Sequence, residues 1–408
     1  MTSFDDVAFL RDDLVRLRRS LHAEPEVGLR LPRTQEKVLA ALDGLPLEIS
    51  TGSRLTSVTA VLRGAKPGPT VLLRADMDAL PLPELTNVDF ASTVDGAMHA
   101  CGHDLHTTML IGAAHLLASR RQDLTGDVVL MFQPGEEGYD GAGAMLAEGV
   151  LDAAGRRPAA AYALHVFTTG FPTGVFMART GPTMAATNDV DVTVTGAGGH
   201  ASAPHRAKDP VPAACEMVTA LQTMVSRTCD PFDPVVLTVG SFHAGTRRNV
   251  IPENVRFEGT VRTFSTQAQG RMKDAVVTLV RQIAAAHGLH AEVEFTPRYP
   301  VTVNDQYETA FVENTVNDTF GEHRFQPLTH PLTGAEDFSR VLAEVPGSLV
   351  MLGATPSGAD PSTVANNHSS YVEFDEGVLS DGAALLARLT TRRLAAQPAE
   401  VLACASAC

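Results

Sequence analysis

Short, almost wholly apolar segments alternate with helical patterns from residue 57 onward, and this alternation is the strongest constraint on the fold. Segments such as PTVLLRADM (69–77), GDVVLMFQP (126–134) and AAYALHV (160–166) are typical of strands. LHTTMLIGAAHLLASRR (105–121) has the apolar spacing of a helix. Strands that are apolar on both faces, with helices between them, indicate a mostly parallel sheet with helices on both faces. We therefore expect an α/β fold.

A different pattern occupies about residues 186–298. The segment DVDVTVTG (189–196) alternates Asp and Thr with Val, which indicates a half-exposed strand. A helix, two strands, a second helix and a last strand follow, and this β-α-β-β-α-β order is that of a ferredoxin-like α+β unit. We therefore predict an inserted domain at 186–298 that interrupts a catalytic domain formed by 1–185 and 299–408.

The charge balance narrows the classes of partner. The 408 residues carry a formal net charge of −15, which argues against nucleic acid and against an anionic membrane surface. No apolar run reaches the roughly 18 residues of a membrane span, and the charged N-terminal stretch lacks the apolar core of a signal peptide. Five cysteines without framework spacing predict no disulfides. We expect a cytoplasmic protein, with Cys404 and Cys408 in a frayed C-terminal tail.

The segment MHACGHDLH (98–106) places a cysteine and three histidines within nine positions, with one glycine between Cys101 and His103. A thiol this close to an imidazole is either a nucleophile with its base or half of a metal site. We expect His106 to be structural, at the start of the following helix.

Residues that bind metals also gather where the predicted strands end. Ligands of open α/β sheets lie beyond the carboxyl ends of the strands, and a two-ion site needs thiolates, imidazoles and carboxylates. Each residue alone has a plain structural explanation, such as a turn cap or a buried histidine, but their joint appearance at one edge favours a metal site. The residues are Asp76 and Asp78, Glu136 and Glu137, His165, and His368 before the last helix.

The adjacent Glu136 and Glu137 suit a division of roles. We expect an extended segment here, in which neighbouring side chains point in opposite directions, so that one carboxylate binds metal while the other faces water and substrate. Two close negative charges would raise the pKa of one carboxyl, as a general base near neutral pH requires.

Eight motifs, in order along the chain, carry a resemblance to a known family. The motifs are RADMDALP, MHACGHD, FQPGEEG, ALHV, GGHASAPH, NVIPE, TGAEDF and NHSSYVEFDE. With them the chain resembles the dinuclear metallo-aminoacylase and carboxypeptidase family, in the branch of hippurate hydrolases, indole-acetyl-amino-acid hydrolases and N-acyl-L-amino-acid amidohydrolases. The similarity extends from LRRSLHAEPEVG, near residue 17, to the C-terminal helix.

The resemblance implies two divalent metal ions per subunit, zinc or manganese, with cobalt or nickel also allowed. It implies that Glu136 is the general base, that Asp78 and Asp76 orient the ligands, and that His200 stabilises the oxyanion, in relatives often across a dimer interface. Asn249, with Arg247 or Arg248, would bind the substrate carboxylate. The implied metal ligands are Cys101, as a bridging thiolate, and His103, Glu137, His165 and His368.

This chain departs from the family pattern near the expected acyl pocket. Asn367 stands where many relatives have a second histidine, SSYVEFDE replaces a run with proline and phenylalanine, and Ala201 stands where glycine is common. No ligand is lost, but the substrate preference of relatives cannot be carried over.

We predict a metal-dependent amidohydrolase that cleaves small N-acyl-L-amino acids to a carboxylic acid and a free amino acid. The inserted domain would act as a lid and dimerisation domain in a homodimer, with a tetramer as the alternative. A dipeptidase or an N-acetyl-diaminopimelate deacylase is the alternative within the family. A thiol amidase with Cys101 as nucleophile and His103 as base, or an inactive binding protein, are the alternatives outside it.

Overall fold

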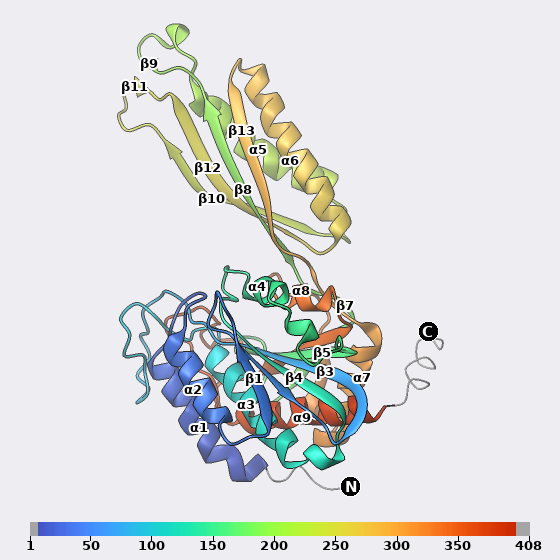
Figure 1. Ribbon diagram of the computed structural model, residues 1–408. Coiled ribbons are helices and arrows are strands. Elements are labelled where there is room, and N and C mark those ends of the chain that lie inside the picture. The colour runs from blue at the N-terminus through green and yellow to red at the C-terminus, as the bar shows by residue number, and fades with distance from the viewer. Residues whose placement is uncertain (1–6, 397–408) are drawn as a thin grey trace. The chain divides into compact units, whose positions relative to one another are not determined.

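A computed structural model describes residues 7–396, which form two compact units (Figure 1). The large unit contains the described residues up to Thr183, Val303–His330 and the described residues from Asp337 onward. The inserted unit contains Met184–Thr302 and Pro331–Glu336. The predicted tail with Cys404 and Cys408 lies outside the described residues.

The large unit is built on a sheet in the order β1-β2-β4-β3-β5-β16-β6-β15. Its centre is parallel, because β3 pairs in parallel with β4 and β5, and β16 pairs in parallel with β5. The remaining strands join it through antiparallel pairs, except that β15 runs parallel to β6. The bounds are β1 (Leu47–Thr51), β2 (Val58–Leu62), β3 (Lys66–Asp76), β4 (Thr125–Gln133), β5 (Ala160–Phe167), β6 (Phe176–Ala178), β15 (Phe325–Pro327) and β16 (Gly347–Gly353).

Both faces of the central strands are buried. In β3, Val71 and Leu73 belong to one face while Leu72 and Arg74 belong to the other, and all four are at most 1% exposed. Burial of the two faces explains why these strands are continuously apolar rather than alternating. The helices of the unit are α1 (Val7–Ala23), α2 (Pro32–Leu42), α3 (His103–Ser119), α4 (Gly141–Ala147), α7 (Gln306–Phe320), α8 (Ser339–Leu342) and α9 (Val378–Ala395).

The inserted unit has an antiparallel sheet in the order β10-β12-β8-β13. Val190, Val192 and Val194 of β8 are buried in a core with residues of both helices, and Asp189 and Asp191 alternate with them. This is the ferredoxin-like arrangement. The elements are β8 (Ala186–Thr195), α5 (Pro210–Thr228), β10 (Val235–Ala244), β12 (Asn254–Thr263), α6 (Thr266–Ala286) and β13 (His290–Tyr299), with the short pair β9 (Gly199–His200) and β11 (Val250–Ile251).

The predicted fold class, a mostly parallel α/β sheet, is confirmed. Within residues 7–396, none of the helices has the length and apolar character that crossing a bilayer requires.

Candidate metal centre

The sheet brings most of the candidate residues to one edge. Because β4, β3, β5 and β16 run in the same direction, their carboxyl ends lie side by side. Asp76 ends β3, Glu136 and Glu137 follow β4, and His165 lies near the end of β5. His368 lies in the loop between β16 and α9.

Cys101 and His103 come to this edge through a tight turn at Gly102, before α3. Gly102 has a φ of 84°, in the left-handed region that favours glycine. A Cβ atom at this position would stand 2.3 Å from Cγ2 of Val166, on β5. A glycine between the two candidate ligands therefore lets the turn lie directly against β5.

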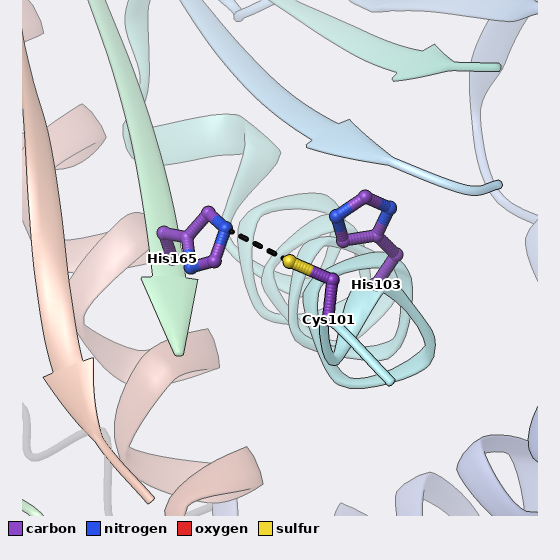
Figure 2. A group of neighbouring side chains, drawn as sticks. All are labelled: Cys101, His103 and His165. Carbon is purple, nitrogen blue, oxygen red and sulfur yellow. Dashed lines mark hydrogen bonds between the residues drawn. The ribbon is translucent and has the colours of Figure 1, made fainter. Parts of the chain in front are cut away.

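Cys101 lies close to donor atoms of four other candidate ligands. Figure 2 shows its sulfur directed toward the ring of His165, and the Sγ–Nε2 distance is 3.5 Å. Cys101 Sγ is also 3.3 Å from His368 Nε2, which in turn is 3.2 Å from Glu137 Oε1. Cys101 belongs to two groups whose ligand atoms lie within 4.8 Å of one another, one with His103 and His165 and one with Glu137 and His368.

His165 uses its Nδ1–H in a hydrogen bond, so the lone pair on its Nε2 faces Cys101. Its Nδ1–H donates to the carbonyl oxygen of Val166 at 3.0 Å, which fixes the tautomer. Burial, with His106 and His103 nearby, holds the pKa of His165 well below its ordinary value despite the opposing effect of Asp76. A neutral imidazole is the form that binds metals.

Unpartnered buried atoms provide a test of whether the residues fit a cation. Both ring nitrogens of His103 are buried and have no hydrogen-bond partner among the described residues. Leaving such atoms unsatisfied costs about 1–3 kcal/mol each. One thiol, three imidazoles and a carboxylate around these atoms are suitable ligands for divalent cations, so the residues fit a metal centre.

The thiol of Cys101 is poorly suited to act as a free nucleophile. Burial and the Glu137 carboxylate raise the pKa of the Cys101 thiol, although His103 opposes them. Reactive cysteines need the opposite shift.

Contacts with Cys101 and Glu137 raise the pKa of His368 to about 10.

The expectation of an extended segment at Glu136–Glu137 is wrong. The two residues form a tight turn between Gly135 and Gly138, which both have positive φ, and the N–H of Gly138 donates to the Glu136 carbonyl. The carboxylates do not diverge, because an oxygen of each lies within 4.8 Å of the other and of a His103 nitrogen. Burial raises the pKa of Glu137, but His368 and His103 outweigh it and lower that pKa below its ordinary value.

Asp78 holds this turn in place. Its two carboxylate oxygens accept the backbone N–H groups of Glu136 at 2.9 Å and Glu137 at 3.1 Å. The same carboxylate lies 3.5 Å from Nδ1 of His103. Asp78 therefore links three of the candidate residues, as expected of a residue that orients ligands.

Asp76 is hydrogen-bonded to His106, a residue that was expected from the sequence to be structural only. The Nδ1–H of His106 donates to Asp76 at 2.6 Å, and its Nε2 accepts the Val166 N–H at 2.8 Å. Asp76 also accepts a hydrogen bond from Arg74 at 2.7 Å. His106 thus ties β3 to the peptide beside His165. The i, i+3 spacing of His103 and His106 on one helix could have indicated that His106 lies beside the site, because residues three apart are neighbours on a helix surface.

A buried network behind the site was also missed. Arg18 and His22 of α1 each contact the Asp104 carboxylate at 2.8 Å, and His22 Nε2 is 3.2 Å from Glu84. Burial raises the pKa of Glu84, but hydrogen bonds from His22, Thr86 and a backbone N–H outweigh it and lower that pKa to about 2. Asp104 follows His103, so the network fixes the first turn of α3.

The lowered pKa of Glu84 predicts a measurable acid sensitivity. Stability linked to Glu84 is present above its unfolded pKa and is lost as the pH falls toward its folded pKa. Between pH 5 and pH 3, metal-free wild-type protein should lose about 2 kcal/mol more unfolding free energy than Glu84→Gln. Urea denaturation at both pH values measures the difference. Glu36→Gln, at an exposed site, is the control, and equal pH slopes in the two variants would contradict the assignment.

The residues predicted to contact substrate lie in the inserted unit. Val250, next to Asn249, pairs with His200 in the β9–β11 ladder, and the Ala201 N–H donates to the Asn249 carbonyl at 3.2 Å. The Val250 N–H donates to the Arg247 carbonyl, also at 3.2 Å. The structure thus gathers His200, Asn249, Arg247 and Arg248 around one hairpin-like pair, with exposed side chains.

Comparisons with known proteins identify the family of the chain. A family model described as peptidase family M20/M25/M40 matches residues 72–392. Thermostable carboxypeptidase 2 of Saccharolobus solfataricus is 38% identical over 385 residues, covering 93% of this chain and 95% of that protein. IAA-amino acid hydrolase ILR1-like 4 of Arabidopsis thaliana is 38% identical over 387 residues, covering 94% of this chain and 86% of that protein.

A solved structure of the same family is also similar to this chain. The Bacillus subtilis YXEP protein, described as a dinuclear metal binding peptidase from the M20 family, is 31% identical with a TM-score of 0.81, covering 95% of this chain and 99% of that one. The resemblance drawn from the sequence motifs, and the prediction of a hydrolase that acts on amide bonds, are confirmed by these matches. The chain belongs to peptidase family M20/M25/M40.

Proposed function

We propose that this hydrolase cleaves the amide bond of N-acyl-L-amino acids and releases a carboxylic acid and a free amino acid. The observation that carries the proposal is the gathering of Cys101, His103, Glu137, His165 and His368 beside Glu136 at one sheet edge. The names of the relatives support the substrate class. A carboxypeptidase and an IAA-amino acid hydrolase both act where the leaving amine belongs to an amino acid.

The five donor residues would hold two divalent cations, zinc or manganese, with cobalt or nickel as alternatives. Sulfur and imidazole donors favour zinc, while the carboxylate also suits manganese. Cations in this position would act as Lewis acids on the amide carbonyl. Asp78 and Asp76 would hold the ligands in place, directly and through His106.

Glu136 would move the proton in the reaction. It takes a proton from the attacking water, whose oxygen forms a bond to the amide carbon. It then delivers that proton to the amide nitrogen as the carbon–nitrogen bond breaks, so the amine leaves neutral. Glu136 is 6% exposed, which keeps its carboxyl away from bulk water.

His200 would stabilise the negative charge on the carbonyl oxygen by donating its Nε2–H. Its Nδ1 accepts the backbone N–H of Ser202 at 3.1 Å, so the ring proton belongs on Nε2. Asn249, with Arg247 or Arg248, would bind the substrate carboxylate, because arginine and amide groups recognise carboxylates through directed hydrogen bonds. The inserted domain would act as the lid that carries these groups.

Hydrolysis of short peptides at the C-terminal residue is the second candidate, because one relative is named a carboxypeptidase. A carboxypeptidase and an N-acyl-amino-acid hydrolase differ only in the acyl part of the substrate.

The proposal also includes the location of the protein and its oligomeric state. We place the protein in the cytoplasm, where the free thiols of Cys101, Cys215 and Cys229 are stable. We propose a homodimer, or a tetramer, assembled through the inserted unit. The exposed Val236 and Phe242 on the edge strand β10 support an interface there.

Metal removal tests the proposal. Purified protein should contain divalent metal by elemental analysis and should release free amino acid from a panel of N-acyl-amino acids and dipeptides. Chelation should abolish turnover, and adding zinc, manganese or cobalt should restore it. Activity that survives complete metal removal but is lost with iodoacetamide would instead support a thiol amidase, and bound metal without turnover would support a binding protein.

A further inference from the structure

The side chain of Asn367 joins three segments that carry candidate ligands. Its Nδ2 donates to the Val166 carbonyl at 2.9 Å and to the Cys101 carbonyl at 3.4 Å. Its Oδ1 accepts the Thr168 N–H at 3.4 Å. Asn367 itself precedes His368, so one amide connects the Cys101 turn, the end of β5 and the His368 loop.

Other hydrogen bonds also hold the residues around His368. The His368 N–H donates to the Ala100 carbonyl at 2.9 Å, and Thr168 Oγ1 donates to the Ala365 carbonyl at 2.8 Å. His368 has a φ of 68°, an unusual conformation for a residue other than glycine. Such a conformation persists only where the surrounding contacts hold it, and Asn367 supplies three of them.

Asn367 is connected to the candidate ligand His165 through the carbonyl oxygen of Val166. This oxygen also accepts the Nδ1–H of His165, at 3.0 Å. Asn367 and His165 therefore share one acceptor, and the position of that carbonyl sets the direction of the His165 Nε2 lone pair. An asparagine side chain suits this place because its NH₂ group can donate to two carbonyls while its oxygen accepts an N–H.

We infer that Asn367 is a positioning residue of the metal centre, which sets the mutual placement of Cys101, His165 and His368. The inference rests on the ligand assignment of the proposed function. Residues that orient ligands in this way typically contribute about 10–100-fold to metal affinity.

Asn367→Asp tests the inference with little change of size. It replaces the two donors with a carboxylate oxygen that faces two carbonyl oxygens. The added negative charge alone would strengthen cation binding, so weaker binding can come only from lost placement. Asn366→Asp is the matched control. It adds the same charge one residue away, and its side chain keeps the oxygen that accepts the Asn367 N–H, a contact of 3.0 Å in the wild type.

Two readouts are measured on the full-length protein. Competition with a chromophoric chelator gives the Kd for Zn²⁺, and the Co²⁺ absorption spectrum reports the thiolate and imidazole geometry. We expect Asn367→Asp to bind Zn²⁺ about 10–100-fold more weakly and to show an altered Co²⁺ spectrum. Asn366→Asp should stay within about twofold of wild type, since it leaves the bridging amide intact. Asn367→Ala, which adds no charge, should weaken binding in the same direction.

The outcomes separate failure of the inference from failure of the proposed function. Equal Zn²⁺ affinity and identical Co²⁺ spectra in Asn367→Asp and Asn366→Asp would overturn the inference, even if thermal unfolding of the metal-free protein shows a lower Tm. If Asn367→Asp does not fold, Asn367→Ala decides in the same way. Wild-type protein that binds neither Zn²⁺ nor Co²⁺ would overturn the proposed function itself.

Discussion

Replacing Glu136 with glutamine is expected to lower kcat by about 10²–10⁴-fold, the usual contribution of a general base. Glutamine has nearly the same size but cannot take a proton from the attacking water. The Asp78 contact to the backbone N–H of residue 136 does not involve the replaced atoms, so the turn should keep its shape. KM should change little, because the loss lies in proton transfer rather than in substrate binding.

Glu137→Gln is the matched comparison, at the next position of the same turn. Glu137 Oε1 lies 3.2 Å from His368 Nε2, and both residues belong to one group of candidate metal ligands. This variant should lose metal affinity, and excess metal should restore part of its activity. Glu136→Gln should keep its metal and gain nothing from excess. Elemental analysis and kcat at several metal concentrations distinguish the two, and retained turnover in Glu136→Gln would exclude Glu136 as the base.

The fold could be predicted from the sequence because local patterns determine most of it. The apolar segments at 69–77, 126–134 and 160–166 became β3, β4 and β5, since burial of both faces requires continuous apolar sequence. The outer strands β1, β6 and β15 were not predicted. Strands β1 and β15 form the edges of the sheet, where less surface is buried, and the three residues of β6 and of β15 are too few to show a period.

The candidate site could be predicted in part, because parallel strands bring their carboxyl ends together. That rule places Asp76, Glu137 and His165 at one edge before any contact is known. The contacts of Asn367 with Cys101 and Val166 could not be predicted, because they span 266 and 201 positions along the chain. The turn at Glu136 was mispredicted because an adjacent carboxylate pair carries no periodic signal. The positive φ of Gly135 and Gly138, which bound the turn, comes from the structure alone.

Gly102→Ala is expected to lower the unfolding free energy by about 2–5 kcal/mol, through two separate costs. A left-handed alanine costs about 1–2 kcal/mol, and forcing an extra methyl into a packed core costs about 1–3 kcal/mol. The second cost arises because the new Cβ would stand 2.3 Å from Cγ2 of Val166. Urea denaturation of the metal-free protein measures the change. Metal affinity should also fall, since Cys101 and His103 flank the substitution.

A second glycine in the same unit separates the two costs. Gly149 has a φ of 88°, close to that of Gly102, but a Cβ there would meet no atom within 4 Å. Gly149→Ala should therefore cost only the conformational part, about 1–2 kcal/mol. Adding Val166→Ala to Gly102→Ala should cost less than the sum of the single changes, because it removes the clashing methyl. Two results together would contradict this explanation: equal destabilisation by Gly102→Ala and Gly149→Ala, and additive effects of Gly102→Ala and Val166→Ala. The contact with β5 would then not be the reason for a glycine between Cys101 and His103.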